Sequence, residues 1–284
     1  MSPAPPRSIL YTPALSLDRV VKAWSYDADV HLIDLEDSVP PAAKADARAV
    51  CRAALEKAPR PGNVAVRVNQ FDRIEAVHDL AMLADCPVLP GIVMMTMVTS
   101  AEEVALYRSI LASAGAHPEI YVTVETVEAV TAADAIAREA DGLVLGSADL
   151  AATLGVEIGW EPMLAARQAM ALACARHDTA CVDTANFRLG EAGVLAEESA
   201  RVRALGFHGK ATVHPAELDV INRTMRAHPD VRHARRVMAA VEAVGGGIAV
   251  LDGNMVGPPF VRLAGMTVAR EEAWAARFGG RADG

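Results

Sequence analysis

Short apolar runs rich in β-branched residues alternate with helical patterns along the first 225 residues, and this alternation constrains the fold more than any other feature. Eight runs read as strands: Ile9–Thr12, Val30–Leu35, Val64–Val68, Val88–Met97, Ile120–Val124, Gly142–Leu145, Ala180–Val182 and Lys210–Val213. Strands that alternate with helices form a parallel sheet, and eight repeats predict its closure into a TIM-type (β/α) barrel. An open doubly wound sheet is the alternative, although no GxGxxG motif follows the first run.

The rhythm breaks after about Met225. An amphipathic pattern predicts a helix over 229–244, the Asp252-Gly253 pair predicts a hairpin over 248–256, and a last helix is expected over about 259–277. We therefore expect a barrel over residues 1–225 and a helix–hairpin–helix extension over 226–284. The extension is too small for a separate domain, so we expect it to pack on the barrel mouth or on a neighbouring subunit.

Composition excludes several classes of partner. The chain of 284 residues has a net charge of −9 and no basic cluster, so nucleic acid and anionic membranes are not expected partners. No apolar run reaches membrane-spanning length, and the proline-rich start MSPAPPRS is not a signal peptide. The cysteines lack CxxC spacing and read as reduced core thiols, which predicts a cytoplasmic protein.

Two acids stand at corresponding places on neighbouring strands. Glu125 ends the fifth run, and Asp149 follows the sixth after the small-residue turn Gly146-Ser147-Ala148. Carboxyl ends of parallel strands carry the chemistry of (β/α) barrels, and Mg²⁺ takes one or two carboxylates together with water and substrate. The sequence therefore predicts a magnesium site at Glu125 and Asp149. The alternative is that each acid only caps the helix that follows it.

Further charged residues accompany the strand ends. Arg7 adjoins the first run, Glu36 and Asp37 end the second, and Arg67 lies within VAVRVN on the third. A buried arginine must be paired or bind an anion, and its planar fork suits a carboxylate. We expect Arg67 to hold a substrate carboxylate, to form an internal salt bridge with Glu36 or Asp37, or to do both in different states.

Two other polar residues near strand ends are interpreted structurally. Asp183 ends a short strand and could reach the barrel mouth, but we expect it to be a solvated turn acid. His214 is followed by a proline, and we expect it to be a hydrogen-bonded histidine at a strand-to-helix turn, not a catalytic group.

Several segments together carry a resemblance to a known family. They are RSILYTP, HLIDLEDSVPPAAKADAR, VAVRVN, VETVEAV, GSADLAATLG and GFHGKATVHPAELDVIN. In this order the set resembles the citrate lyase β-subunit-like (CitE-like) proteins, which belong to the HpcH/HpaI aldolase group of the phosphoenolpyruvate/pyruvate barrel superfamily. The match spans nearly the whole chain, and the ordered set is more specific than any one motif.

The resemblance implies an activity, a cofactor and roles for particular residues. It implies a Mg²⁺-dependent carbon–carbon lyase that acts on a 3-hydroxyacyl-CoA or related hydroxy acid and releases a small 2-keto acid. It implies Glu125 and Asp149 as metal ligands and Arg67 as the clamp for the substrate carboxylate. Trimers, or assemblies built from trimers, are common in the family, so a homotrimer is expected.

From the chemistry of the retro-Claisen reaction, we expect catalytic roles for Arg67, Asp37 and Glu36. Substrate contacts are expected from Arg67, from Arg7 and from the turn Gly146-Ser147-Ala148. Backbone N–H groups of this turn can help bind an oxyanion at a helix N-terminus.

The chain departs from the family pattern in three places. The segment MTMVTS places Met97 and Thr99 where relatives carry lysine and glutamate, and Ala14 stands where glycine is frequent. More important, the tail reads GNMVG, with Gly257 in place of an aspartate that serves as acid/base, while Asp252 lies nearby in a different register. We therefore keep two alternatives to the lyase that acts on a CoA thioester. One is an aldolase that acts on free hydroxy-keto acids, and the other is a catalytically silent homologue that binds a keto acid or a partner subunit.

Overall fold

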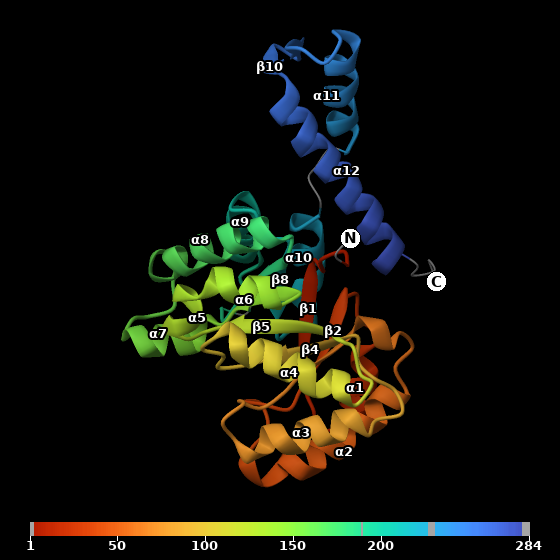
Figure 1. Ribbon diagram of the computed structural model, residues 1–284, viewed down its shortest axis with the longest axis vertical. Helices are drawn as coiled ribbons and strands as arrows, with labels where there is room; N and C mark the ends of the chain where they lie inside the picture. The colour runs from red at the N-terminus through yellow and green to blue at the C-terminus, as the bar shows by residue number, and fades with distance from the viewer. Residues whose placement is uncertain (1–2, 189, 227–230, 280–284) are drawn as a thin grey trace. The chain divides into compact units, whose positions relative to one another are not determined.

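Eight parallel strands close into a barrel in chain order, each hydrogen-bonded to the next and β8 to β1 (Figure 1). The computed structural model describes residues 3–188, 190–226 and 231–279. The strands are β1 Ser8–Pro13, β2 Val30–Asp34, β3 Val64–Arg67, β4 Ile92–Met95, β5 Glu119–Val124, β6 Gly142–Leu145, β7 Ala180–Asp183 and β8 Gly209–Thr212. The predicted barrel is confirmed, and the open doubly wound alternative is excluded.

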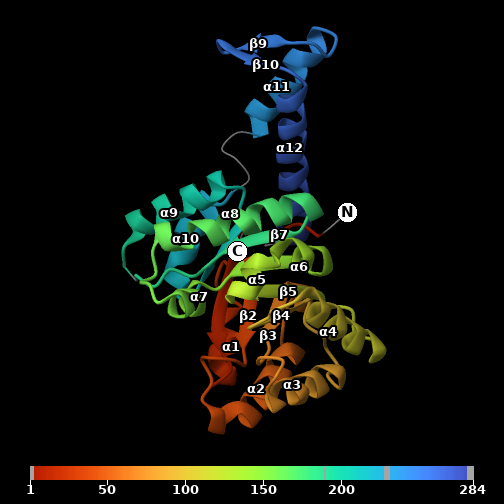
Figure 2. The ribbon, with the colours of Figure 1, turned by 60° about the vertical axis from the view of Figure 1, so that its left-hand side comes forward.

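Helices follow the strands and cover the outside of the barrel. They are α1 Leu17–Ala23, α2 Lys44–Glu56, α3 Ile74–Ala84, α4 Ala101–Ser113, α5 Val127–Thr131, α6 Ala133–Glu139, α7 Ser147–Leu154, α8 Trp160–His177, α9 Ala192–Ala204 and α10 Leu218–Thr224. Short 3₁₀ turns η1 Pro41–Ala43, η2 Pro61–Asn63 and η3 Pro215–Glu217 complete the connections. Figure 2 shows α8, α9 and α10 on one side of the strands and α2 and α3 on the other.

Side-chain alternation separates the barrel lumen from the helical layer. The Tyr11 hydroxyl lies 3.1 Å from the Met94 sulfur. Their strands β1 and β4 are not neighbours, so these side chains meet across the lumen. Leu10, one residue before Tyr11, packs outward among Ala23 and Leu218 of the helices. The period of two along each strand therefore assigns every strand residue to one of the two layers.

The chain divides into two compact units, residues 6–224 and a second unit of 3–5 with residues 225 onward. In the second unit α11 (Val231–Ala243) and α12 (Pro258–Phe278) run side by side (Figure 1) and enclose a small apolar core with the hairpin β9 (Ala249–Leu251) and β10 (Asn254–Val256). Asp252 and Gly253 both have positive φ, 52° and 80°, as a two-residue type I′ hairpin turn requires. The expected helix–hairpin–helix extension is therefore confirmed, although residues 227–230, where its first helix was expected to begin, lie outside the described residues.

The described residues contain no helix that is both long enough and apolar enough to cross a bilayer. All four cysteines are buried free thiols.

Gly91 gives a direct test of how closely the backbone segments at the amino end of the barrel approach each other. A Cβ at position 91, just before β4, would overlap the carbonyl of Gly62 in η2, whereas a Cβ at Gly62 would meet nothing within 4 Å. We expect Gly91→Ala to lower the free energy of unfolding by roughly 1–3 kcal/mol, because backbone must move to admit the methyl group. Gly62→Ala is the matched control and should change stability little. Equal urea midpoints for the two variants would contradict this packing.

Candidate active site

Glu125 and Asp149 come from adjacent strands at the same end of the barrel. Glu125 directly follows β5. Asp149 lies in the first turn of α7, and only Gly146 separates β6 from the start of this helix. Strands β5 and β6 pair in register, with Thr123 opposite Val144. The structure thus brings the two predicted metal ligands to one mouth of the barrel.

The Glu125 carboxylate is fixed by its neighbours. It is buried, and its Oε1 accepts a hydrogen bond of 2.7 Å from the backbone N–H of Met97. Met97 has a φ of 52°, a left-handed conformation that is uncommon for residues other than glycine. Gly146 lies against the other side, where a Cβ would stand only 2.5 Å from the Glu125 Cβ and Oε2 atoms. Glycine at position 146 therefore makes room for the carboxylate.

The surroundings disfavour a lone charge on Glu125. Burial is the main cause that raises its pKa, to about 8, and the negative charges of Asp149 and Glu36 raise it further against the Met97 hydrogen bond and Arg67. An added cation would stabilise the ionised carboxylate and reverse this shift. The site is thus short of positive charge at the place where a metal ion is predicted.

Arg67 is paired inside the lumen with an acid that the sequence did not single out. Its Nε and Nη2 donate to the two oxygens of Asp34, both at 2.7 Å, and its Nη1 lies 3.0 Å from Glu36 Oε2. Its guanidinium carbon stands 5.2 Å from the centre of the Tyr11 ring. Of the two expectations for Arg67, the structure shows an internal ion pair, mainly with Asp34 and with Glu36 as second partner. Asp34 stands opposite Arg67 in the register between β2 and β3, and no pattern within one strand gives that register.

Glu36 has a pKa above the usual value of a glutamate. Burial raises its pKa to about 7, against the attraction of Arg67, and the charge of Asp37 adds to the rise. The Lys44 ammonium holds the loop by donating to the carbonyl oxygens of Leu35 and Glu36, each at 2.8 Å. Asp37 itself is exposed beside Glu36. A carboxyl with a pKa near neutrality can accept a proton at working pH, so Glu36 fits the role of a base better than Asp37 does.

Arg7 lies at the opposite end of the barrel. It precedes β1, and its Nη2 donates to Asp29 Oδ1 at 2.9 Å while its backbone N–H donates to Asp29 Oδ2 at 2.8 Å. Asp29 in turn precedes β2. Both residues are therefore at the amino ends of their strands, and the expectation that Arg7 contributes to the substrate site is wrong. The reason is that Arg7 stands before its strand, whereas Glu36, Glu125 and Asp149 follow theirs.

Asp183 is not the solvated turn acid that the sequence suggested. It is fully buried on the helical side of β7, where Lys210 and Arg167 pair with it at 2.7 and 2.8 Å. Burial alone raises its pKa, but these two positive charges outweigh burial and hold the pKa below its usual value. The structural interpretation of His214 is confirmed, because its Nδ1 accepts from the Ala216 N–H at the start of η3.

The two carboxylates suit Mg²⁺ better than a metal ion whose ligands all come from protein side chains. Within the part of the chain that the structure describes, no three His, Cys, Asp or Glu side chains gather closely enough to hold a metal ion. Magnesium keeps several waters and needs only one or two carboxylates beside a substrate. Glu125 and Asp149 fit that requirement, since both are oxygen donors and the mouth around them carries excess negative charge.

Comparison with known proteins agrees with this geometry. The family model described as HpcH/HpaI aldolase/citrate lyase matches residues 7–215. The chain is 30% identical to a (3S)-malyl-CoA thioesterase of Cereibacter sphaeroides, over 96% of each protein, and 31% identical to citrate lyase subunit beta of Escherichia coli, over 94% of this chain and 93% of that one. A solved structure of CitE from Mycobacterium tuberculosis, in complex with magnesium, acetoacetate and coenzyme A, aligns over 95% of this chain and 99% of that one, with a TM-score of 0.78 and 28% identity.

The family match covers all eight barrel strands, from Arg7 to the start of η3, and the relatives match nearly the full length of both chains. This chain therefore belongs to the HpcH/HpaI aldolase/citrate lyase family.

Proposed function

We propose that this protein is a Mg²⁺-dependent carbon–carbon lyase that cleaves a 3-hydroxyacyl-CoA or a related hydroxy acid and releases a small 2-keto acid. The observation that carries the proposal is the excess of acids over cations at the mouth, where Arg67 faces Asp34 and Glu36 while Glu125 has a pKa of about 8. Among the described residues of the mouth the acids outnumber the cations, and a bound metal ion would supply the missing positive charge. The magnesium and acetoacetate of the M. tuberculosis relative support this reading.

Glu125 and Asp149 would hold the Mg²⁺, which would lower the pKa of the substrate hydroxyl when it is bound. The chain's own residues do the rest. Arg67 binds and orients the substrate carboxylate with its charged donors. Glu36, with a pKa of about 7, takes the hydroxyl proton as the bond between the carbinol carbon and the acyl α-carbon breaks. The electron pair passes to the thioester carbonyl, where backbone N–H groups at the start of α7 stabilise the negative charge.

Gly257 gives a specific reason to keep a second candidate. Protonation of the resulting enolate carbon needs an acid, and the family aspartate that would supply one is replaced here by Gly257. An aldolase that acts on free hydroxy-keto acids forms a pyruvate enolate, whose carbon would take its proton from solvent, so this reaction would not depend on an acid from the tail. We therefore propose free-acid aldol cleavage as the alternative activity.

We propose that the protein works as a homo-oligomer, a trimer or a multiple of it, and that the extension packs on the barrel mouth of a neighbouring subunit. The extension supports this because large apolar side chains on it are exposed, namely Ile248, Val250, Met255, Phe260, Leu263 and Met266. Val250 and Met255 stand opposite each other across the hairpin, so at least these two adjoin on its surface, and adjoining exposed apolar side chains mark interaction sites. The four free thiols support the cytoplasmic location that we propose.

The metal assignment can be tested at both carboxylates. Replacing Glu125 or Asp149 by alanine should abolish Mg²⁺-dependent binding of oxaloacetate or pyruvate, because one carboxylate alone leaves the ion mostly hydrated. Isothermal calorimetry with and without MgCl₂ measures this. Asp141→Ala is the matched control: it removes an acid from the other end of β6, where Asp141 binds Arg108, so it should cost stability and leave metal binding intact. Unchanged binding in both ligand variants would refute the assignment.

Arg67→Lys separates substrate binding from an ion pair that only stabilises the barrel. A lysine keeps the charge next to Asp34 but cannot offer a planar fork to a second carboxylate. Loss of one charge-assisted hydrogen bond is worth about 1.5–3 kcal/mol, so kcat/KM should fall about tenfold or more. A fall of less than a few-fold, together with a lower melting temperature, would show that Arg67 is only a structural partner.

Gly257→Asp tests the tail. Gly257 is the N-cap of α12 in an extended conformation, with φ of −162°, and a Cβ there would make ordinary contacts of 3.6 Å with Ile248 and 3.9 Å with Gly247. Aspartate therefore fits and favours the helix start. We expect weak native cleavage of malyl-CoA and citramalyl-CoA and a gain in the variant, because a positioned acid is worth roughly two to four orders of magnitude.

Two products must be followed in that experiment. Cleavage of the carbon–carbon bond releases a keto acid, which forms a phenylhydrazone, whereas thioester hydrolysis releases a free thiol that reacts with Ellman's reagent. Gly257→Ala is the control, since it adds a Cβ without an acid. Efficient keto-acid release by the wild type would show that another residue, with Asp252 as the first candidate, performs the proton transfer.

A further inference from the structure

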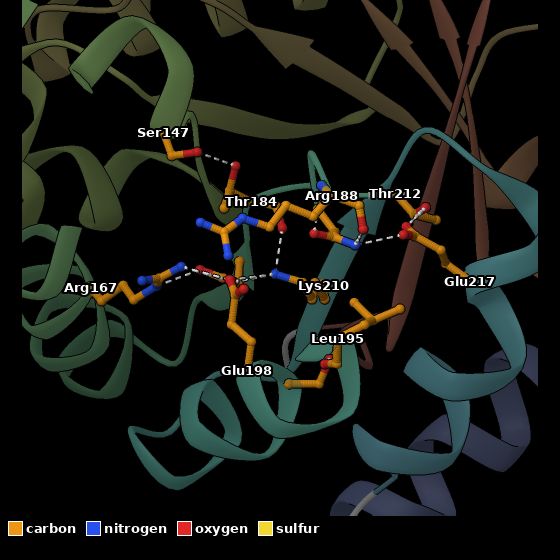
Figure 3. A network of polar contacts seen from close by, with 12 residues as sticks. Ser147, Arg167, Thr184, Arg188, Leu195, Glu198, Lys210, Thr212 and Glu217 are labelled. Carbon is orange, nitrogen blue, oxygen red and sulfur yellow. Dashed lines mark hydrogen bonds and ion pairs between the residues drawn. The ribbon is translucent and has the colours of Figure 1, made fainter. Parts of the chain in front are cut away.

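A buried ionic network lies between the barrel and the helices beside β7 and β8 (Figure 3). At its centre the fully buried Lys210 ammonium donates to Asp183 Oδ2 at 2.7 Å, to the Thr184 carbonyl oxygen at 2.9 Å and to Glu198 Oε1 at 3.1 Å. A lysine ammonium has three N–H donors, and three acceptors surround it here. Lys210 is therefore held in one orientation, and it holds Thr184 in turn.

Arg167 completes the charge balance of the network. Its Nε donates to Asp183 Oδ1 at 2.8 Å, and its Nη2 lies 3.1 Å from Glu198 Oε1. Two cations thus face two carboxylates, and a buried network that is balanced in this way is rigid, because moving any member leaves a charge without its partner. The network therefore fixes the carboxyl end of β7 relative to β8 on the helical side of the barrel.

Thr184 connects this ionic network to the barrel mouth. It directly follows β7, its carbonyl is bound by Lys210, and its hydroxyl shares a hydrogen bond of 2.8 Å with the hydroxyl of Ser147. Both side chains are buried. Figure 3 shows the two links meeting at Thr184, one toward Lys210 and one toward Ser147. Ser147 is the first residue of α7, and Asp149 follows in the same turn.

Helix α7 has little else in its own sequence to fix its first turn. It has eight residues, and its N-cap Gly146 offers no side-chain hydrogen bond to the free backbone N–H groups. Short helices depend on tertiary contacts for their order. A hydrogen bond at Ser147 therefore restrains the very turn that places the Asp149 carboxylate.

We propose that Thr184 and Lys210 are positioning residues for Asp149. The ionic network holds the Thr184 backbone, and the Thr184 hydroxyl holds Ser147. Ser147 in turn orders the first turn of α7, which orients the Asp149 carboxylate toward the metal site that we propose with Glu125. This inference rests on the proposed function where it concerns the metal, but the ordering of α7 by Thr184 can be measured without any metal.

Thr184 is the best place to test the chain of contacts. Thr184→Val removes the bond to Ser147 and leaves the carbonyl contact to Lys210 and all four charges in place. Thr184→Ser keeps a hydroxyl and should restore the wild-type properties. Thr179→Val is the matched control: this buried threonine stands at the amino end of the same strand, and its hydroxyl donates to the Ala137 carbonyl oxygen at 2.7 Å.

Two measurements are made on the full-length protein: amide hydrogen exchange of the segment 147–151 without metal, and the dissociation constant of Mg²⁺ by calorimetry in the presence of oxaloacetate. In Thr184→Val we expect faster exchange in this segment and roughly tenfold weaker Mg²⁺ binding, the lower range for loss of a residue that orients a metal ligand. Thr184→Ser should stay within about twofold of wild type in both measurements. Thr179→Val should lower the melting temperature to a similar degree as Thr184→Val and leave both measurements unchanged.

The outcomes separate this inference from the proposed function. If Thr184→Val lowered the melting temperature but left exchange and Mg²⁺ affinity as in wild type, the link would be merely structural and the inference would be overturned. If the wild type bound no Mg²⁺, the proposed function would fall, while the exchange comparison would still decide whether Thr184 orders α7.

Discussion

Side-chain alternation along eight short strands sorts the charges of this barrel into two layers with different roles. On the helical side, Asp183 is matched by Lys210 and Arg167, and with Glu198 the charges cancel. On the lumen side, Arg67 faces more acids than it can neutralise. The first layer is electrically complete and needs no ligand. The second is incomplete, and this difference is the reason why we propose that the chemistry takes place there.

The incomplete layer is arranged so that its groups have different acidities. Asp34 lies against the Arg67 fork, which holds its pKa below the usual value although burial opposes this. Burial is less well compensated by positive charge at Glu36, which is half-buried, and at Glu125, and their pKa values rise to about 7 and about 8. Neighbouring carboxyls whose pKa values diverge in this way can serve as fixed anchor, proton acceptor and metal ligand respectively. The role that we propose for each acid follows from its partners and not from its residue type.

The sequence predicted the architecture well because the barrel depends on local periodicity, which a single chain displays. It predicted that Glu125 and Asp149 lie at the same mouth of the barrel for the same reason, since one follows β5 and the other lies in the helix that follows β6. It failed where the answer depended on which end of a strand a residue occupies, as with Arg7, or on which face it points to, as with Asp183. The partnership of Arg67 with Asp34 needed the register between β2 and β3, which no local pattern contains.

Met97 illustrates a kind of contribution that residue identity does not record. Its part in the mouth is a main-chain N–H, presented to Glu125 by a left-handed turn of the backbone. Any amino acid except proline carries that donor, so the side chain can change without loss of the contact wherever it tolerates the left-handed φ, which β-branched residues do not. The hydrogen bond to Glu125 thus depends on the backbone conformation at position 97, and the residue type there can change while the bond is kept.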